Sequence, residues 1–186
     1  PVNARGVDVR QGLLAGIERA ESEGAKAVLI YGQGRTYFAG ADIREFGKPP
    51  QDPGLPELCT RIEASPLLVV SAIHGTALGG GLEVALSTHY RVAVPSAKCG
   101  LPEVKLGLPP RAGGTQRLPR IVPTETALAT VTSGRHVAAQ QCHQLGLVAD
   151  PAGQGKPPDG PTTSANNHAS AHRPPKHCPT HTAHAA

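Results

Sequence analysis

Residues 66–120 read PLLVVSAIHGTALGGGLEVALSTHYRVAVPSAKCGLPEVKLGLPPRAGGTQRLPR and carry the clearest structural pattern in the chain. The apolar run at 67–73 is typical of a short strand that is buried on both faces. Three glycines at 79–81 follow it, then a segment at 82–87 that favours a helix and an apolar run at 90–94. This order of strand, turn, helix and strand predicts an α/β fold with a largely parallel sheet.

The same alternation continues outward from this segment. Residues 27–31, AVLIY, form a short apolar run that we expect to be a further buried strand. Leu13, Ile17 and Ala20 recur at helical spacing and predict a helix at 8–22. We expect further helices at 55–64, 113–120, 124–132 and 138–145. Residues 1–150 are therefore predicted to form one folded domain.

The last part of the chain has a different composition. Residues 151–186 contain no Leu, Ile, Val, Phe or Tyr and are rich in Pro, Ala, His and Thr. Such a segment cannot bury enough apolar surface to offset the entropy lost on ordering, so we predict a disordered tail. A structural zinc site needs compact ligand spacing within a fold, and we expect no metal site here. The histidines and cysteine of this tail are His168, His172, His177, His181, His184 and Cys178.

The composition also narrows the possible partners. The chain has 186 residues, a net charge of +4 and only 3% aromatic residues. Since no basic stripe with stacking rings is visible, we do not expect nucleic-acid binding. No apolar run is long enough to cross a bilayer and no signal peptide is recognisable, so we expect a cytoplasmic protein without membrane contact.

The cysteines and two histidines of the chain have unremarkable interpretations. Four cysteines, at 59, 99, 142 and 178, lie far apart without a CxxC pair. This pattern indicates reduced, mostly buried thiols. His74 and His89 lie in or beside predicted strands, and we expect packed or hydrogen-bonded side chains rather than metal ligands.

The glycines at 79–81 are a chemical signal as well as a turn. Without Cβ atoms the backbone can approach a ligand closely, and the first amides of the following helix have no intrahelical partner. Backed by the positive end of the helix dipole, these amides can stabilise an oxyanion. Glu83 follows within one helical turn, close enough for acid–base chemistry. The alternative interpretation is a structural turn with a glutamate that only favours the dipole. No GxGxxG or GxxxxGK[ST] motif supports nucleotide binding.

Taken with FAGADI at 38–43 and GLPEVKLGL at 100–108, residues 66–120 closely resemble the enoyl-CoA hydratase/isomerase, or crotonase, family. PVNA at 1–4 and LGLV at 145–148 also match, so the resemblance covers essentially all of 1–149. HYR at 89–91 looks most like the hydratase half of the bifunctional fatty-acid β-oxidation enzymes. The implied fold is a crotonase-like ββα superhelix, incomplete because its first strand and C-terminal helices are missing from the sequence. We interpret the break at Asp150 as a frameshifted or degraded gene end.

The resemblance implies a set of site residues. The backbone amides of Ala41 and Gly80 would form the oxyanion hole for the thioester oxygen. Glu83 and Glu103 match the two catalytic carboxylates of the family, with Glu83 activating water for attack at Cβ and Glu103 supplying a proton to Cα. The other candidate substrate-binding residues are Ala39, Asp42, Gly79, Gly81, Leu108 and Arg111.

The implied function is hydration of a trans-2-enoyl-CoA in fatty-acid β-oxidation, with coenzyme A as part of the substrate and no other cofactor. Two alternatives stay open: an enoyl-CoA Δ3-Δ2 isomerase, and a non-catalytic remnant that binds acyl-CoA weakly or not at all. Family members form trimers and dimers of trimers. The missing C-terminal helices put this assembly in doubt here.

Two residues depart from the family pattern. Arg111 stands where relatives have a glycine, and it either pairs with Glu103 and removes its acid role or points to solvent. Phe38 stands where a small residue is common, and it either crowds the acyl pocket or adds to the core.

Overall fold

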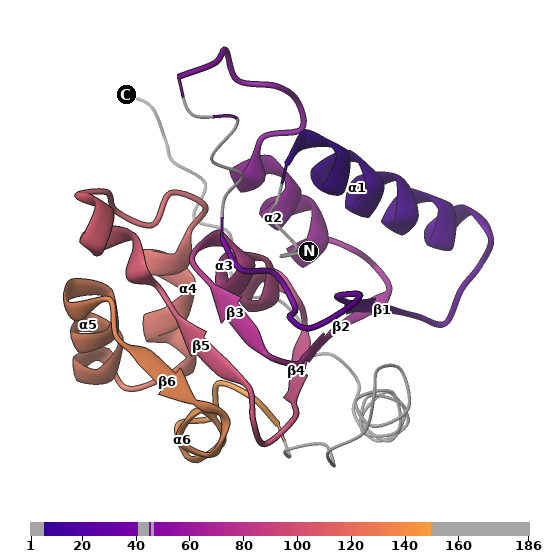
Figure 1. Cartoon of the computed structure of the whole chain (residues 1–186). Helices are drawn as coiled ribbons and strands as arrows, with labels where there is room; N and C mark the ends of the chain where they lie inside the picture. The colour runs from indigo at the N-terminus through magenta and orange to yellow at the C-terminus, as the bar shows by residue number, and fades with distance from the viewer. Residues whose placement is uncertain (1–5, 41–44, 46, 150–186) are drawn as a thin grey trace, which may run out of the picture.

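Two three-stranded sheets organise the part of the chain that the computed structural model describes, which is residues 6–40, 45 and 47–149 (Figure 1). The first sheet is entirely parallel, and its order is β1 (Ala27–Tyr31), β2 (Leu68–Ile73), β4 (Tyr90–Ala93). In the second sheet β5 pairs parallel with β3 and antiparallel with β6. Its strands are β3 (Thr76–Leu78), β5 (Lys98–Gly100) and β6 (His136–Ala138). The predicted α/β fold with a largely parallel sheet is confirmed.

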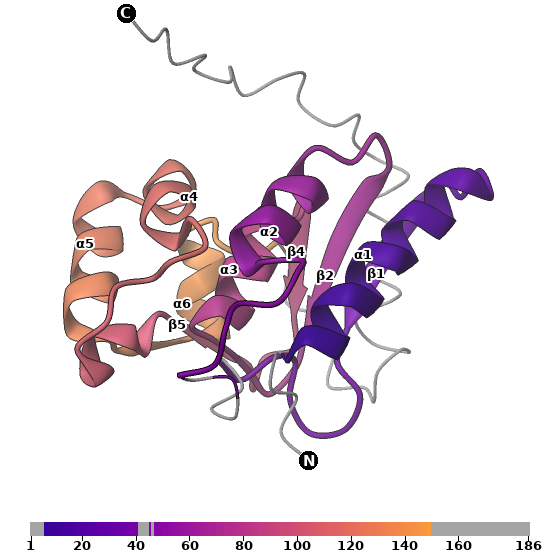
Figure 2. The same ribbon diagram turned by 90° about the horizontal axis from the view of Figure 1, so that it is seen from above.

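The helices connect and cover these strands. They are α1 (Val7–Ser22), α2 (Leu55–Glu63), α3 (Gly80–Ser87), the 3-10 helix η2 (Pro102–Leu106), α4 (Gly114–Ile121), α5 (Thr124–Ser133) and α6 (Ala139–Gln144). Each predicted α-helix is present, with ends that differ by at most two residues. Figures 1 and 2 show α1 at one end of the molecule and α4, α5 and α6 gathered at the other, with α2 and α3 between them.

The central strand β2 is buried on both faces, as its apolar run predicts. Val69 and Ile73 belong to the main core with α1, α2 and α3. Val70 and Ala72 lie in a second cluster with Val92 of β4. The parallel register pairs Ser71 with Arg91 and Ile73 with Ala93, which places the carboxyl ends of β2 and β4 side by side.

Arg91 fixes the carboxyl end of α3. Its Nη1 donates to the carbonyl of Thr88 at 2.7 Å, and its Nε donates to the carbonyl of Leu147 at 2.8 Å. Burial lowers the pKa of Arg91 to about 10, so the guanidinium remains cationic at neutral pH. The last carbonyls of α3 are therefore anchored to the segment that follows α6, which helps to hold the helix that carries Glu83.

The remaining cysteine and histidine predictions agree with the structure where it describes them. Cys59, Cys99 and Cys142 are buried, whereas Cys178 lies outside the described residues. The interaction with Cys142 and, after it, burial raise the pKa of the Cys99 thiol. His74 Nε2 lies 3.1 Å from the carbonyl oxygen of Gly34, so its side chain is hydrogen-bonded in the core.

Candidate active site

One cavity of about 480 Å³ collects most of the candidate site residues. It lies between the loop that follows β1, the turn from β3 into α3, and η2 with the loop after it. Seven of the ten predicted site residues line it: Ala39, Gly79, Gly80, Glu83, Glu103, Leu108 and Arg111. Gly40, Leu55, Leu78, Pro102, Leu106 and Pro109 complete the wall. Residues more than sixty positions apart in the sequence are thus brought to one place.

The turn at Gly79 needs glycine for two reasons. Its backbone has φ +56° and ψ −133°, which L side chains rarely adopt. A Cβ on Gly79 would also lie 3.1 Å from Oε1 of Glu103. The amide of Gly79 donates to the carbonyl of Gly100 at 2.9 Å, which ties the turn to β5. The backbone of this turn therefore lies next to the carboxylate of Glu103.

Helix α3 begins at Gly80, at the edge of this cavity. The amide of a first helical residue has no acceptor within its own helix and carries the positive end of the helix dipole. Gly80 is thus a suitable donor to an oxyanion. Ala41, the other predicted donor, and Asp42 lie outside the described residues.

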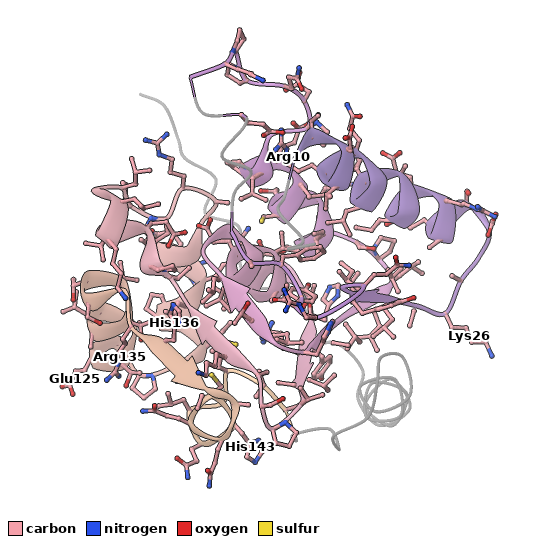
Figure 3. All side chains as sticks on the ribbon, viewed as in Figure 1. Arg10, Lys26, Glu125, Arg135, His136 and His143 are labelled. Carbon is pink, nitrogen blue, oxygen red and sulfur yellow. The ribbon has the colours of Figure 1, made fainter. Side chains whose placement is uncertain are left out.

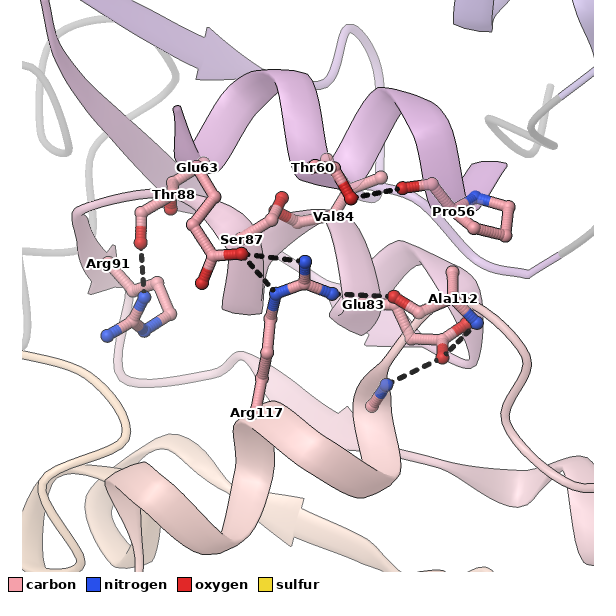
Figure 4. Close-up of polar contacts among 11 residues, drawn as sticks. Pro56, Thr60, Glu63, Glu83, Val84, Ser87, Thr88, Arg91, Ala112 and Arg117 are labelled. Atoms are coloured by element: carbon pink, nitrogen blue, oxygen red, sulfur yellow. Dashed lines mark hydrogen bonds and ion pairs between the residues drawn. The ribbon is translucent and has the colours of Figure 1, made fainter. Parts of the chain in front are cut away.

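Glu83 is a buried carboxylate that the backbone holds in place. Its side chain is in the first turn of α3, and the residue is only 2% exposed. Oε1 accepts hydrogen bonds from the amides of Ala112 at 2.7 Å and Gly114 at 2.9 Å (Figure 4). Two amide donors on one oxygen restrict the rotation of the carboxylate. A carboxylate fixed in this way is suited to act as a general base.

Glu103 lines the cavity from η2. It lies in the first turn of this 3-10 helix, after Pro102. The helix ends at Gly107, which has φ +68°, and the amide of Leu108 donates to the carbonyl of Glu103 at 3.1 Å. This tight return places Leu108 in the cavity wall with Glu103.

The structure also shows where Gly81, Phe38 and Arg111 lie, three residues that the sequence singled out. Gly81 does not line the cavity, and its role is packing, because a Cβ there would lie 2.1 Å from the carbonyl oxygen of Phe38. Phe38 is 6% exposed, its ring is tilted by 57° against that of Tyr37 with the centroids 4.4 Å apart, and it adds to the core rather than to the cavity wall. Arg111 is exposed, and none of the ion pairs between described residues joins it to Glu103.

Sequence reasoning missed the groups that support Glu83. The amides of Ala112 and Gly114 lie 29 and 31 residues from it, and no local pattern signals such a contact. Arg117 also escaped notice, although it binds the carbonyl of Ala112. The glycine pair at 113–114 was the available signal, since a Cβ on Gly114 would lie 3.0 Å from Oε1 of Glu83.

The described residues were also compared with the needs of a metal site. Within the ranges that the structure describes, no group of three or more His, Cys, Asp or Glu side chains is placed to hold a metal ion. The histidines of the tail and Cys178 lie outside those ranges.

The chain is similar to known proteins over most of its length. Residues 1–154 match the family model described as enoyl-CoA hydratase/isomerase. A peroxisomal bifunctional enzyme from Danio rerio is 50% identical over 149 residues, which are 80% of this chain and 21% of that protein. A probable enoyl-CoA hydratase from Bacillus subtilis is 42% identical over 156 residues, with 80% of this chain and 60% of that protein covered. The chain thus spans between about a fifth and three fifths of these curated relatives.

Solved structures show the same fold. The enoyl-CoA hydratase from Mycobacterium tuberculosis superposes with a TM-score of 0.81 and 29% identity, covering 92% of this chain and 68% of that one. The enoyl-CoA hydratase from Bacillus anthracis gives a TM-score of 0.80 and 30% identity, covering 91% and 67%. Because the family model matches residues 1–154 of this 186-residue chain, the chain belongs to the enoyl-CoA hydratase/isomerase family.

Proposed function

We propose that this chain is an enoyl-CoA hydratase, which adds water to a trans-2-enoyl-CoA thioester. The observation that carries the proposal is a single cavity lined by Glu83, Glu103 and the Gly79–Gly80 turn. The hydratase names of the relatives from Bacillus subtilis and Mycobacterium tuberculosis support it. Acyl-CoA is the partner we propose, and coenzyme A enters only as part of the substrate.

The first task of such a site is to polarise the thioester carbonyl. The amide of Gly80 lies at the start of α3 and donates to the carbonyl oxygen, with the amide of Ala41 as the second donor expected from the family. Negative charge then develops on an oxygen that faces fixed donors, and Cβ becomes electrophilic. Loss of one such donor costs about 10²–10³ in rate.

The two carboxylates divide the proton transfers. The amides of Ala112 and Gly114 hold Oε1 of Glu83, so Oε2 is the oxygen that takes a proton from the attacking water. Water adds at Cβ, and Glu103 delivers a proton to Cα as the enolate collapses. Each positioned acid–base group contributes about 10²–10⁴ in rate.

The presence of both carboxylates at one cavity favours the hydratase over the isomerase. A shift of the double bond moves one proton between two carbons and needs a single carboxylate, whereas hydration must also activate a water. A 3-enoyl-CoA substrate separates the two activities, because only the isomerase converts it to the 2-enoyl isomer.

The test is hydration of crotonyl-CoA, followed by the loss of enoyl absorbance. We expect Glu103→Gln and Glu83→Gln each to lower kcat/KM by about 10²–10⁴. Glu125→Gln is the matched control, since Glu125 is an exposed glutamate on α5 at the far edge of the molecule (Figure 3). Folded parent protein without hydration activity would contradict the proposal and support the non-catalytic remnant.

The cellular location remains a prediction. No helix in the described ranges is long and apolar enough to span a bilayer. The sequence favours the cytoplasm, whereas the relative from Danio rerio is named a peroxisomal enzyme. Fractionation of cells expressing a tagged chain would distinguish the two.

A further inference from the structure

We propose that Arg117 is a positioning residue of this site: its guanidinium ties Glu63 of α2 to the carbonyl of Ala112 and thereby fixes the loop whose amides hold Glu83. The catalytic consequence rests on the proposed hydratase function, whereas the effect on the loop does not.

The guanidinium of Arg117 has two different partners. Its Nη1 donates to the carbonyl oxygen of Ala112 at 2.7 Å. Its Nη2 and Nε both donate to Oε2 of Glu63, at 2.8 and 3.3 Å (Figure 4). The side chain of Arg117 is only 12% exposed although that of Glu63 is 52% exposed. The arginine is therefore held between α2 and the loop, and the carboxylate is its anchor on the outer side.

Ala112 is held from two sides. Its carbonyl accepts from Arg117, and its amide donates to Oε1 of Glu83. The guanidinium also folds back over the next residue, because a Cβ on Gly113 would lie 2.3 Å from Nη1. Gly113, with φ +90°, leads directly into α4. The side chain of Arg117 thus occupies the space that defines the path of this loop.

The loop needs such support because residues 108–113 belong to no helix or strand. Yet these residues must place the amides of Ala112 and Gly114 on one carboxylate oxygen. A displacement of about 1 Å in a catalytic group can cost about 10²-fold in rate. Arginine suits this role better than lysine, since its planar fork can donate to a carbonyl and a carboxylate at the same time.

The first measurement is amide hydrogen exchange, read residue by residue, and it needs no activity. In Arg117→Gln we expect the amides of Ala112 and Gly114 to exchange about 10-fold faster or more, while the core strands keep their protection. Arg61→Gln is the matched control. Arg61 pairs with Glu21 and joins α2 to α1, away from the cavity. Equal acceleration throughout the protein, or the same change in Arg61→Gln, would overturn the inference.

The second measurement is a double-mutant cycle on crotonyl-CoA hydration. We expect Arg117→Gln to lower kcat by about 10- to 100-fold with KM changed by less than about threefold, and Arg117→Lys to restore part of the loss. In the Glu83→Gln background the same substitution should cause no further loss, because its effect passes through Glu83. Losses that multiply in full would show that Arg117 acts independently of Glu83 and would refute the proposal.

The two measurements separate the inference from the proposed function. If the parent protein does not hydrate the substrate, the proposed function fails and the exchange experiment alone decides whether Arg117 orders this loop. If the parent is active and the exchange of Ala112 and Gly114 is unchanged in Arg117→Gln, the hydratase stands and the positioning role falls.

Discussion

At the scale of the residue, Gly79 joins backbone geometry to catalysis. Its positive φ excludes most side chains, and its missing Cβ leaves room for the Glu103 carboxylate. We expect Gly79→Ala to destabilise the protein by about 1–3 kcal/mol through backbone strain and also to displace Glu103. Hydration activity should then fall further than the loss of folded protein explains. Thermal unfolding and kcat, measured on the same preparation, test this.

Gly24→Ala separates the two effects. Gly24 follows α1 with φ +68°, and a Cβ there would meet no atom within 4 Å. It should show the cost of a left-handed backbone alone, with a lower Tm and unchanged kcat. If Gly79→Ala also retains its kcat, the contact between the turn and Glu103 has no catalytic weight.

The site residues differ in how far the sequence could predict them. Glu83 and Glu103 stand in short motifs that match a family pattern, and both line the cavity. Arg117 and the amide of Ala112 could not be predicted, because their roles depend on contacts with Glu63 and Glu83 on other helices. The orientation of Arg111 was equally open, since both a carboxylate and solvent were within reach of its side chain.

At the scale of the element, His89 lies between α3 and β4 and contacts β2. Its Nδ1 accepts from the amide of Val69 in β2 at 2.9 Å, and Glu63 at the end of α2 lies close enough to influence its charge. The hydrogen bond from Val69 needs an unprotonated Nδ1. Burial lowers the pKa of His89 below its ordinary value of 6.5. The folded protein therefore takes up this proton less readily than the unfolded chain does.

This linkage predicts how stability depends on pH. The contribution of His89 is complete above the unfolded-state pKa of 6.5 and is lost as the pH falls from there to the lower folded-state pKa. Tm measured from about pH 7.5 to about pH 5 should show the parent losing its advantage over His89→Asn. A difference between the parent and His89→Asn that stays constant over this range would contradict the linkage.

The elements could be predicted where the sequence carries an apolar run or a helical spacing. Continuous apolar runs mark β1, β2 and β4, and the helical spacing of Leu13, Ile17 and Ala20 marks α1. The strands β3, β5 and β6 have three residues each, and η2 has five. Such short elements show no periodicity, and they form because the longer elements bring their backbones together. Their positions nonetheless matter, because Gly79 directly follows β3 and Glu103 lies in η2, shortly after β5.

At the scale of the whole molecule, the cavity has an apolar and exposed side. Leu106 lines it and is 73% exposed. The matched part of the solved hydratases covers 67–68% of their chains, so a third of each relative has no counterpart here. We expect the described fold to bind an acyl-CoA without that third.

Binding to the native state alone raises the unfolding temperature by mass action. At a free ligand concentration of about 100 Kd the gain is about 2.7 kcal/mol, or roughly 5–11 °C for a chain of this size. Butyryl-CoA is the suitable probe, because a saturated thioester has no double bond to hydrate. Free coenzyme A is the control for binding through the nucleotide part alone, and a larger shift with butyryl-CoA would show that the acyl thioester enters the cavity. A cooperative transition that neither ligand moves would mean a folded chain without the binding function, and the absence of any cooperative transition would mean that these residues do not form a stable fold by themselves.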